Sequence, residues 1–472
     1  MNTNDIVSKL WNLCNILKDD GITYHQYVTE LTLLLFLKMA KETKVESRLP
    51  EGYRWDELST QDGLEQYHFY KELLLKLESA DDALVASIYT GANTNIREPK
   101  YLSQLIADIN KLEWHGMERE DLGDMYEGLL EKNANETKSG AGQYFTPRVL
   151  IDVMVKLMNP QAGEVIQDPA SGTGGFLLAA DSVIRAKTDD YYDLNTEQIA
   201  FQKNEAYVGM ELVPDTHRLA LMNTMLHDLD GGSQGIIRLG NTLATEGQRL
   251  PKADLILSNP PFGTKKGGGL PTRDDFTYPT SNKQLAFLQH IYRGLNAGGR
   301  AAIVLPDNVL FEGNIGKDIR VDLMEKCNLH TILRLPTGIF YAQGVKTNVL
   351  FFERGKTDNA NTKEVWVYDL RTNMPSFGKR IPLTEKHFAE FEKAYRAKTR
   401  KDEGEKGRFR CFSREEIRKK EDSLDISWLQ DDSIEDVADL PTPDVLIRET
   451  KVGLEEALME LEKLYAELGV EK

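Results

Sequence analysis

A chain of 472 residues is long enough for two or three domains, and a composition of 40% hydrophobic and 28% charged residues is typical of a globular protein. The apolar stretch at residues 31–37 is far shorter than the roughly 20 residues that a membrane-spanning helix needs. The formal net charge of −17 argues against a protein that binds nucleic acid through a broad basic surface of its own.

Residues 1–135 are predicted to form a helical N-terminal domain. Apolar residues recur there at helical spacing, and the expected helices lie near residues 6–17, 24–41, 102–112 and 121–131. The polar, glycine-rich stretch 133–142 is typical of a loop or linker. We therefore expect a second domain to begin at about residue 136.

Residues 136–355 show a different pattern, in which short apolar runs alternate with helical segments. The runs are EVIQD, AYVGME, GIIRLGN, ADLILS, RAAIVLP, HTILRLP and TNVLFF. This alternation predicts an α/β fold, a mainly parallel sheet with helices on both faces. Ligands of such sheets bind at the carboxyl ends of the strands, and the polar motifs of this chain follow those ends.

The remainder of the chain divides into two parts. Residues 356–442 are mixed and highly charged, which is typical of a solvated surface. Residues 443–472 are predicted to form a C-terminal helix for subunit assembly. Its apolar residues fit a coiled-coil seam that Lys451 interrupts: Ile447, Leu454, Leu458, Leu461, Tyr465 and Leu468.

The chain has three cysteines, Cys14, Cys327 and Cys411, which lie far apart and form no CxxC pair. Their number fits a reducing cytoplasm and argues against a disulfide framework or a zinc site. The first residues, MNTNDIVSKL, lack the basic and apolar regions of a secretory signal. We therefore expect a cytoplasmic protein that needs no metal.

The first motif, DPASGTGGF at residues 168–176, follows the run EVIQ directly. Its glycines allow a tight turn and a close approach of the backbone to a ligand, and the next helix begins with free N–H groups. A plain strand-to-helix turn is the alternative. The spacing favours neither a dinucleotide nor a nucleoside triphosphate, because it matches neither GxGxxG nor GxxxxGK[ST].

Two polar residues follow the next strands. Glu211 ends the run AYVGM, where an acid can accept hydrogen bonds from both hydroxyls of a ribose. Asn241 ends the run GIIRLG, where an amide can pair with an adenine edge. A surface acid and a turn-forming asparagine are the alternatives at these two positions.

The motif with the sharpest chemical implication is NPPF, residues 259–262, after the run ADLILS. Its prolines fix φ and remove two N–H donors, so that the Asn259 side-chain oxygen and the Pro260 carbonyl remain as acceptors at the strand end. Phe262 adds an aromatic ring. Two acceptors and a ring suit a planar base that carries an amino group.

Two further segments flank these motifs. QYFTP at residues 143–147 is either a loop at the domain entry or a cover for a cofactor. The segment 263–284 is long and contains Lys265, Lys266 and three consecutive glycines. We interpret it as a mobile cover, with a bare connector as the alternative.

Together, QYFTP, DPASGTGGF, GME, GNTL and NPPF resemble, in this order, the adenine-specific DNA methyltransferases. Further segments resemble the modification subunit of type I restriction-modification systems: DLGDMYEGLLEK, AGGRAAIVLPDNVLF, LPTGIFYAQGVKTNVLFF and SLDISWL. The resemblance covers most of the chain. It implies a Rossmann-like, seven-stranded sheet that binds S-adenosylmethionine.

The resemblance also implies roles for single residues. Glu211 would hold the cofactor's ribose, and Asn241, which stands where related methyltransferases commonly carry an acid, its adenine ring. Asn259, Pro260, Pro261 and Phe262 would form the catalytic motif that holds the target adenine. The cofactor's methionine part would lie against Asp168, Gly172 and Gly174, helped by Phe145, Thr146 and Pro147. Tyr144, Ser171 and Thr173 are further candidate cofactor-binding residues.

The partners that the resemblance implies are double-stranded DNA and a separate specificity subunit, typically one for two modification subunits. A restriction subunit is a further partner that the family implies, and the predicted mobile cover at 263–284 would contact the DNA backbone. The acidic charge and the predicted C-terminal helix agree with this expectation. The residues leave other possibilities open: a self-sufficient methylase, a non-catalytic DNA-binding scaffold, or a methylase of cytosine amino groups, RNA guanine or protein glutamine.

Overall fold

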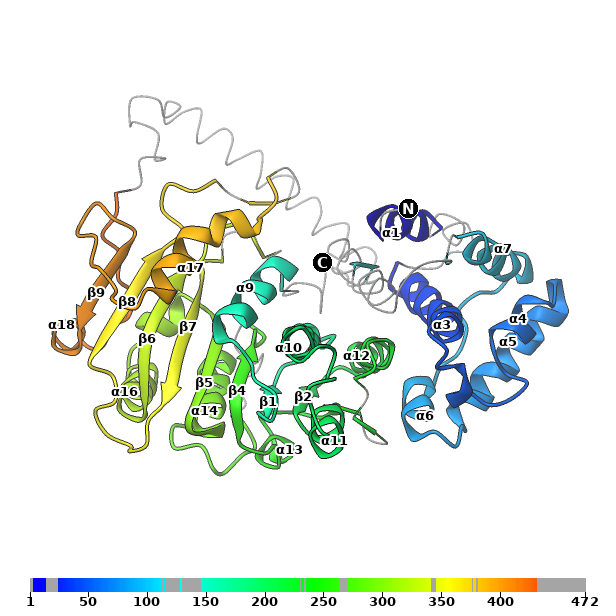
Figure 1. Ribbon diagram of the computed structural model, residues 1–472, viewed down its shortest axis with the longest axis horizontal. Coiled ribbons are helices and arrows are strands. Elements are labelled where there is room, and N and C mark those ends of the chain that lie inside the picture. The colour runs from blue at the N-terminus through cyan, green and yellow to red at the C-terminus, as the bar shows by residue number, and fades with distance from the viewer. Residues whose placement is uncertain are drawn as a thin grey trace, which may run out of the picture. The chain divides into compact units, whose positions relative to one another are not determined.

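The computed structural model describes residues 3–13, 24–112, 114, 128–129, 146–229, 231–232, 235–262, 270–340, 345–375, 377–378 and 381–430 (Figure 1). They belong almost entirely to one compact unit, Met1–Ser427. The predicted C-terminal helix at 443–472 lies outside the described residues, as does the predicted helix at 121–131 apart from residues 128 and 129.

The N-terminal part of this unit is helical. Its central helix, α3 (Tyr24–Glu42), buries the run Leu31–Leu37 to 1% exposure or less, because neighbouring helices surround it. The predicted helices at 24–41 and 102–112 are both present. The other elements here are α1 (Thr3–Asn12), η1 (Glu46–Arg48), α4 (Trp55–Ser59), α5 (Gly63–Glu78), α6 (Ala83–Tyr89) and α7 (Pro99–Asn110).

All seven predicted apolar runs form strands of one sheet. The strands are β1 (Ile166–Asp168), β2 (Tyr207–Glu211), β3 (Ile237–Leu239), β4 (Ala253–Ser258), β5 (Leu295–Pro306), β6 (Cys327–Arg334) and β7 (Thr347–Arg354). Strand β7 lies between β5 and β6 and runs antiparallel to both, whereas β1 to β5 pair in parallel.

The prediction of seven strands was wrong, because the described residues form a sheet of nine, in the order β3-β2-β1-β4-β5-β7-β6-β8-β9. The added strands, β8 (Glu364–Asp369) and β9 (Phe409–Ser413), come from the charged region after residue 355. Val365, Val367 and Phe409 are buried there. The charged residues around them interrupt the apolar pattern, so the two strands were not predicted from the sequence. The division of the chain at residue 355 stays a prediction.

Helices cover both faces of the sheet (Figure 1). One face carries α9 (Arg148–Met158), α10 (Gly175–Lys187) and α12 (Pro214–Leu226), and the other carries α14 (Lys283–Gly294) and α16 (Ile315–Lys326). The remaining elements are α11 (Thr196–Asn204), α13 (Thr245–Gln248), α15 (Asn308–Phe311), η4 (Glu385–Phe388), α17 (Ala389–Arg396) and α18 (Arg414–Lys419).

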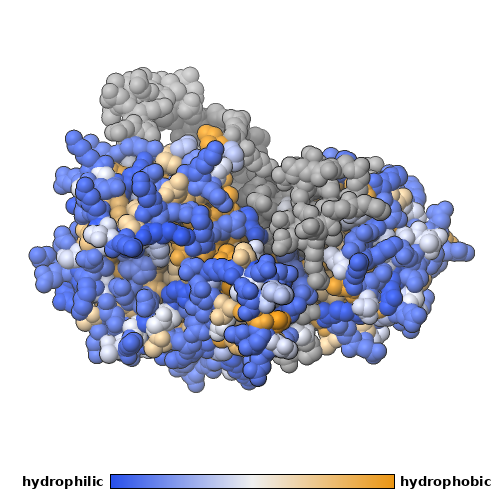
Figure 2. Space-filling model, in the orientation of Figure 1, coloured by the Kyte–Doolittle hydropathy of each residue, from blue (hydrophilic) through white to orange (hydrophobic). Residues whose placement is uncertain are grey.

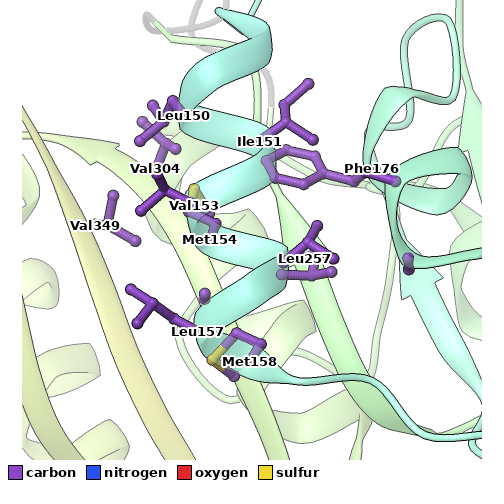
Figure 3. Packing of buried hydrophobic residues seen from close by; sticks show 14 of the residues in the cluster. Leu150, Ile151, Val153, Met154, Leu157, Met158, Phe176, Leu257, Val304 and Val349 are labelled. Carbon is purple, nitrogen blue, oxygen red and sulfur yellow. The ribbon is translucent and has the colours of Figure 1, made fainter. Parts of the chain in front are cut away.

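Helix α9 directly follows Pro147 and packs on the sheet. Its apolar side chains recur at helical spacing, and Figure 3 shows Leu150 and Val153 among Val304 of β5 and Val349 of β7. Ile151 lies against Phe176 of α10 in the same view. Burial of each such side chain contributes roughly 1.5–3 kcal/mol, so the start of α9 is held firmly at the sheet edge.

Helix α12 joins the sheet to the N-terminal helices. Its residues Leu221, Met222, Met225 and Leu226 belong to the same buried cluster as the apolar run of α3.

None of the described helices combines the length and the apolar character that crossing a membrane requires. The face of the molecule in Figure 2 is mainly hydrophilic, with small apolar patches.

Candidate active site

The predicted motifs meet at one edge of the sheet, where the parallel strands β1 to β4 have their carboxyl ends (Figure 1). Asp168 and Glu211 are the last residues of β1 and β2, and Asn259 directly follows β4. Asn241 lies two residues beyond the end of β3. This placement agrees with the expectation from the sequence.

The glycine motif forms a tight turn between β1 and α10. Gly172 (φ +53°) and Gly174 (φ +88°) adopt the left-handed conformation, and Gly174 is the N-cap of α10. A Cβ atom added to Gly172 would meet no described atom within 4 Å, so the backbone faces open space there. The Oγ atom of Ser171 is buried and has no hydrogen-bond partner among the described residues. This turn has the properties of a ligand-binding turn.

Asp168 is a buried carboxyl, with 1% of its surface exposed. Burial raises its pKa to about 7, although hydrogen bonds from Ser258 Oγ (2.7 Å to Oδ1) and the Ala170 N–H (3.1 Å) oppose the shift. The Glu211 carboxylate adds a smaller upward contribution. A positive charge near this carboxyl would stabilise its ionised form.

Ser258 was not among the predicted site residues. It is the last residue of β4 and lies between the glycine motif and NPPF because β1 and β4 are neighbours in the sheet. Its position directly before Asn259 was the signal in the sequence. The residue that its hydroxyl contacts, 90 positions away, could not be foreseen without the strand pairing.

Glu211 connects the second strand to the glycine motif. Its Oε2 atom accepts a hydrogen bond from the Gly172 N–H (3.0 Å), and its Oε1 atom accepts one from the Val213 N–H (2.8 Å). Burial raises the pKa of this carboxyl, whereas the backbone donors lower it. Each carboxylate oxygen has two lone pairs, so acceptor capacity remains for the hydroxyls of a ligand.

Asn241 shapes its own turn. Its Oδ1 atom accepts from the Leu243 N–H (2.9 Å), and its carbonyl accepts from the Ala244 N–H (2.9 Å). The neighbouring Thr242 is buried and donates from Oγ1 to the Pro169 carbonyl of the glycine motif (2.5 Å). The Asn241 side-chain oxygen is therefore used within the turn, as the turn-forming alternative expects. The amide NH₂ group is the part that could meet an adenine edge.

A hydrogen bond links NPPF to the QYFTP segment. The Asn259 Nδ2 atom donates to Thr146 Oγ1 (2.9 Å), and Asn259 is 9% exposed. Pro147 is the N-cap residue of α9, whose burial fixes this end of the segment. Tyr144 and Phe145 lie outside the described residues. The structure thus brings Thr146 to the NPPF motif.

The aromatic end of NPPF is largely buried. Phe262 is 9% exposed and meets Phe340 edge to face, with ring centroids 6.0 Å apart. Pro260 is buried and Pro261 is half-buried. The ring thus lies at the boundary between the site and the core beneath it.

The segment after NPPF is anchored over its described part. Residues 263–269, which include the two lysines and three glycines, lie outside the described residues. Tyr278 exchanges two hydrogen bonds with the Gln289 side chain of α14 (3.1 and 2.7 Å), and Asp274 and Asp275 accept from Gln248 of α13. The predicted role as a mobile cover on DNA stays a prediction for residues 263–269.

The described residues contain no cluster of three or more histidine, cysteine or acidic side chains that could hold a metal ion. The groups that do converge at the edge are carboxyls, amides, a hydroxyl and glycine backbone. Such groups can hold the ribose, amine and base of a nucleoside and can accept hydrogen bonds from an amino group.

Comparison with known families accounts for both parts of the chain. The family model "N-6 DNA Methylase" matches residues 117–436, and "HsdM N-terminal domain" matches residues 6–109. The EcoKI methylase subunit of Escherichia coli K12 is 53% identical, and the alignment covers 99% of this chain and 96% of that subunit. The StySPI methylase subunit of Salmonella potsdam is 54% identical over the same shares.

Solved structures agree with this comparison. The crystal structure of the EcoKI M protein is 47% identical, covers 99% of this chain and 97% of its own, and has a TM-score of 0.58. A structure on the complex assembly of a type I restriction-modification system is 28% identical, with a TM-score of 0.72 over 98% of both chains. The chain is therefore an N6-adenine DNA methyltransferase. It belongs to the methylase subunits of type I restriction enzymes, within the N-6 DNA methylase family.

Proposed function

We propose that the methyl donor is S-adenosylmethionine and that it binds along the carboxyl ends of β1, β2 and β3. The observation that carries this proposal is the hydrogen bond between the Gly172 N–H and the Glu211 carboxylate (3.0 Å), because it joins the glycine turn to the acid at the carboxyl ends of β1 and β2. The open space at Gly172 and the buried Ser171 hydroxyl also fit a ligand at this turn.

Each part of the cofactor has a group of matching chemistry. Asp168 would face the cationic methionine part, and Glu211 would accept hydrogen bonds from the ribose hydroxyls. Asn241 would present its amide NH₂ group to the adenine ring. The turn residues Ser171, Gly172, Thr173 and Gly174, with Thr146, Pro147 and the undescribed Tyr144 and Phe145, would enclose the methionine end.

When bound, S-adenosylmethionine supplies an electrophilic methyl group on its sulfonium. The protein's task is then to hold the target amine in line with that methyl group and to localise its lone pair. The Asn259 side-chain oxygen and the Pro260 carbonyl would accept both amino hydrogens. The bond from Asn259 Nδ2 to Thr146 supports this role because it fixes the plane of the amide.

The adenine must leave the duplex to reach these acceptors, which costs a few kcal/mol. Stacking on an aromatic ring returns about 1–3 kcal/mol per base. Phe262 would supply the ring, while Pro261 stiffens the motif. Because Phe262 is 9% exposed against Phe340, we propose that its ring turns toward the site when the base enters.

Sequence specificity would come from a separate specificity subunit, two methylase subunits binding one such subunit on double-stranded DNA. The similarity to a structure on type I complex assembly and the net charge of −17 support this arrangement. A restriction subunit could join the same assembly. Activity of the chain alone at a defined sequence would favour a self-sufficient methylase instead.

Calorimetry with S-adenosylmethionine tests the cofactor site. Glu211→Ala should weaken binding at least about tenfold, because charged hydrogen bonds contribute roughly 1.5–3 kcal/mol each. Glu197→Ala, which removes an exposed carboxylate on α11, serves as the matched control and should bind like the unaltered chain. Equal affinity of both variants, with the fold intact, would remove Glu211 from the ribose role.

A further inference from the structure

One arginine outside the predicted motifs connects the cofactor edge to the segment that follows NPPF. The Arg273 side chain is 5% exposed, and its Nη1 atom donates to the Thr242 carbonyl (2.9 Å) and to His290 Nδ1 (2.7 Å). Its Nε and Nη2 atoms grip the Asp275 carboxylate at 2.8 and 2.6 Å. The guanidinium also lies 4.4 Å from the ring centroid of Phe276.

The charges around this arginine are well defined. Burial and the positive charge of Arg273 lower the pKa of His290 to about 3, so the imidazole is neutral. Because a guanidinium has no acceptor, His290 Nδ1 must accept and its proton sits on Nε2. Hydrogen bonding to Arg273 lowers the pKa of Asp275 to about 2. Arg273 is thus a fixed cation with acceptors from its own loop, from α14 and from the turn after β3.

The contact with Thr242 places this cation next to the cofactor edge. Thr242 follows Asn241, the candidate contact for the cofactor's adenine ring, and its hydroxyl holds the Pro169 carbonyl of the glycine motif (2.5 Å). A continuous chain of hydrogen bonds therefore runs from the segment after NPPF, through Arg273 and Thr242, to the glycine motif.

We infer that Arg273 is a positioning residue for the cofactor's adenine pocket. Its guanidinium holds the turn 241–244 against the glycine motif and fastens that turn to the segment leaving NPPF. This inference rests on the proposed function, since it concerns the same pocket. Loss of the guanidinium leaves the Thr242 carbonyl without its charged donor, and the turn that presents Asn241 loses its support.

The test compares variants of Arg273 with a matched control. Arg293 also donates to the loop, at Thr277 Oγ1, but does not touch the turn at 241–244, so Arg293→Ala is the control. In calorimetry, Arg273→Ala should bind S-adenosylmethionine about tenfold more weakly, the effect of one charged hydrogen bond. Arg273→Lys should recover part of the affinity, because it restores the charge but not the fork.

Kinetics of the methylase assembled with its specificity subunit give a second readout. KM for S-adenosylmethionine should rise in Arg273→Ala while kcat stays within about twofold, because the contact acts on cofactor binding in both states. A fall in melting temperature with unchanged KM and unchanged affinity would assign Arg273 a merely structural role and overturn the inference. Failure of the unaltered chain to bind the cofactor would instead contradict the proposed function.

Variants of Thr242 test the hydrogen bond from its hydroxyl to the Pro169 carbonyl, and they do so even if Arg273→Ala fails to fold. Thr242→Val removes the hydroxyl that holds Pro169 and should weaken S-adenosylmethionine binding severalfold, whereas Thr242→Ser keeps the hydroxyl and should bind like the unaltered chain. Equal affinities of the valine and serine variants would break the proposed connection from Arg273 to the glycine motif.

Discussion

Among single residues, the Asp168 carboxyl is the group whose charge state would matter most for the proposed cofactor binding. Burial raises its pKa to about 7, so it is largely neutral below that pH and ionised above it. The methionine part of S-adenosylmethionine is cationic and favours the ionised form. Binding therefore requires the deprotonated carboxyl, and the fraction of Asp168 in that form falls as the pH is lowered.

We predict that the affinity for S-adenosylmethionine falls about tenfold between pH 8 and pH 6, as expected for one carboxyl with a pKa near 7. Asp168→Asn should bind weakly, with a flatter pH profile, because the amide cannot ionise. Calorimetry across this range measures both. An affinity that is constant with pH in the unaltered chain, or an equal pH dependence in the asparagine variant, would contradict this role.

Asn259 has a different role in the proposed mechanism, where it would act on the target base and not on the cofactor. Asn259→Ala should lower kcat for methyl transfer about a hundredfold or more, the scale of losing one positioned electrostatic contact. Cofactor affinity should stay within about twofold. The exposed Asn204→Ala on α11 is the control. Near-normal transfer by the Asn259 variant would remove this residue from the mechanism.

The sequence placed Asp168, Glu211 and Asn259 correctly at strand ends, because hydrophobic periodicity and glycine turns are local signals. The partners of these residues were not predictable. The Asn259–Thr146 contact spans 113 residues and depends on how α9 packs on the sheet. The burial of Phe262 against Phe340 likewise depends on tertiary packing.

At the scale of elements, α12 occupies a special position. It begins three residues after Glu211, and its Asn223 Nδ2 atom donates to the Thr173 carbonyl of the glycine motif (3.0 Å). Its Arg218 donates from Nε to the Ile88 carbonyl (2.8 Å) and from Nη2 to the Thr90 carbonyl (2.6 Å). One helix thus contacts both the glycine motif and the end of α6.

We predict that Arg218→Ala lowers the free energy of unfolding by about 1–3 kcal/mol, because two carbonyls at the end of α6 lose a charged donor. Chemical denaturation measures the change. Arg418→Ala, at an exposed position on α18, should stay within about 0.5 kcal/mol of the unaltered chain. Equal stability of the two variants would show that α12 does not depend on this contact.

The strands show how far an element can be predicted from its sequence. The seven predicted runs are apolar enough to be recognised in the sequence, and all seven form strands. Strands β8 and β9 escaped prediction because each lies in a highly charged region, where the buried alternate residues are hard to distinguish. The antiparallel direction of β7 follows from chain connectivity and not from its composition.

At the scale of the whole molecule, the acidic charge and the predicted C-terminal helix bear on the proposed assembly of this chain with a specificity subunit. An isolated amphipathic helix of about 25 residues gains little stability alone, so its apolar seam needs a partner. We predict that a chain lacking residues 443–472 stays folded and binds cofactor but fails to copurify with the specificity subunit. Lower thermal stability of the truncated chain by itself would show that the helix folds back on the chain's own helices.

In the proposed function, this chain methylates adenine through the NPPF motif, at a sequence chosen by another subunit. The most direct measurement follows labelled methyl groups from S-adenosylmethionine into DNA, with the chain alone, with the specificity subunit added, and with Asn259→Ala in the complex. We predict N6-methyladenine at one defined sequence, formed only by the complex that contains unaltered Asn259. Methylated cytosine, or equal methylation by the Asn259→Ala complex, would contradict the claim.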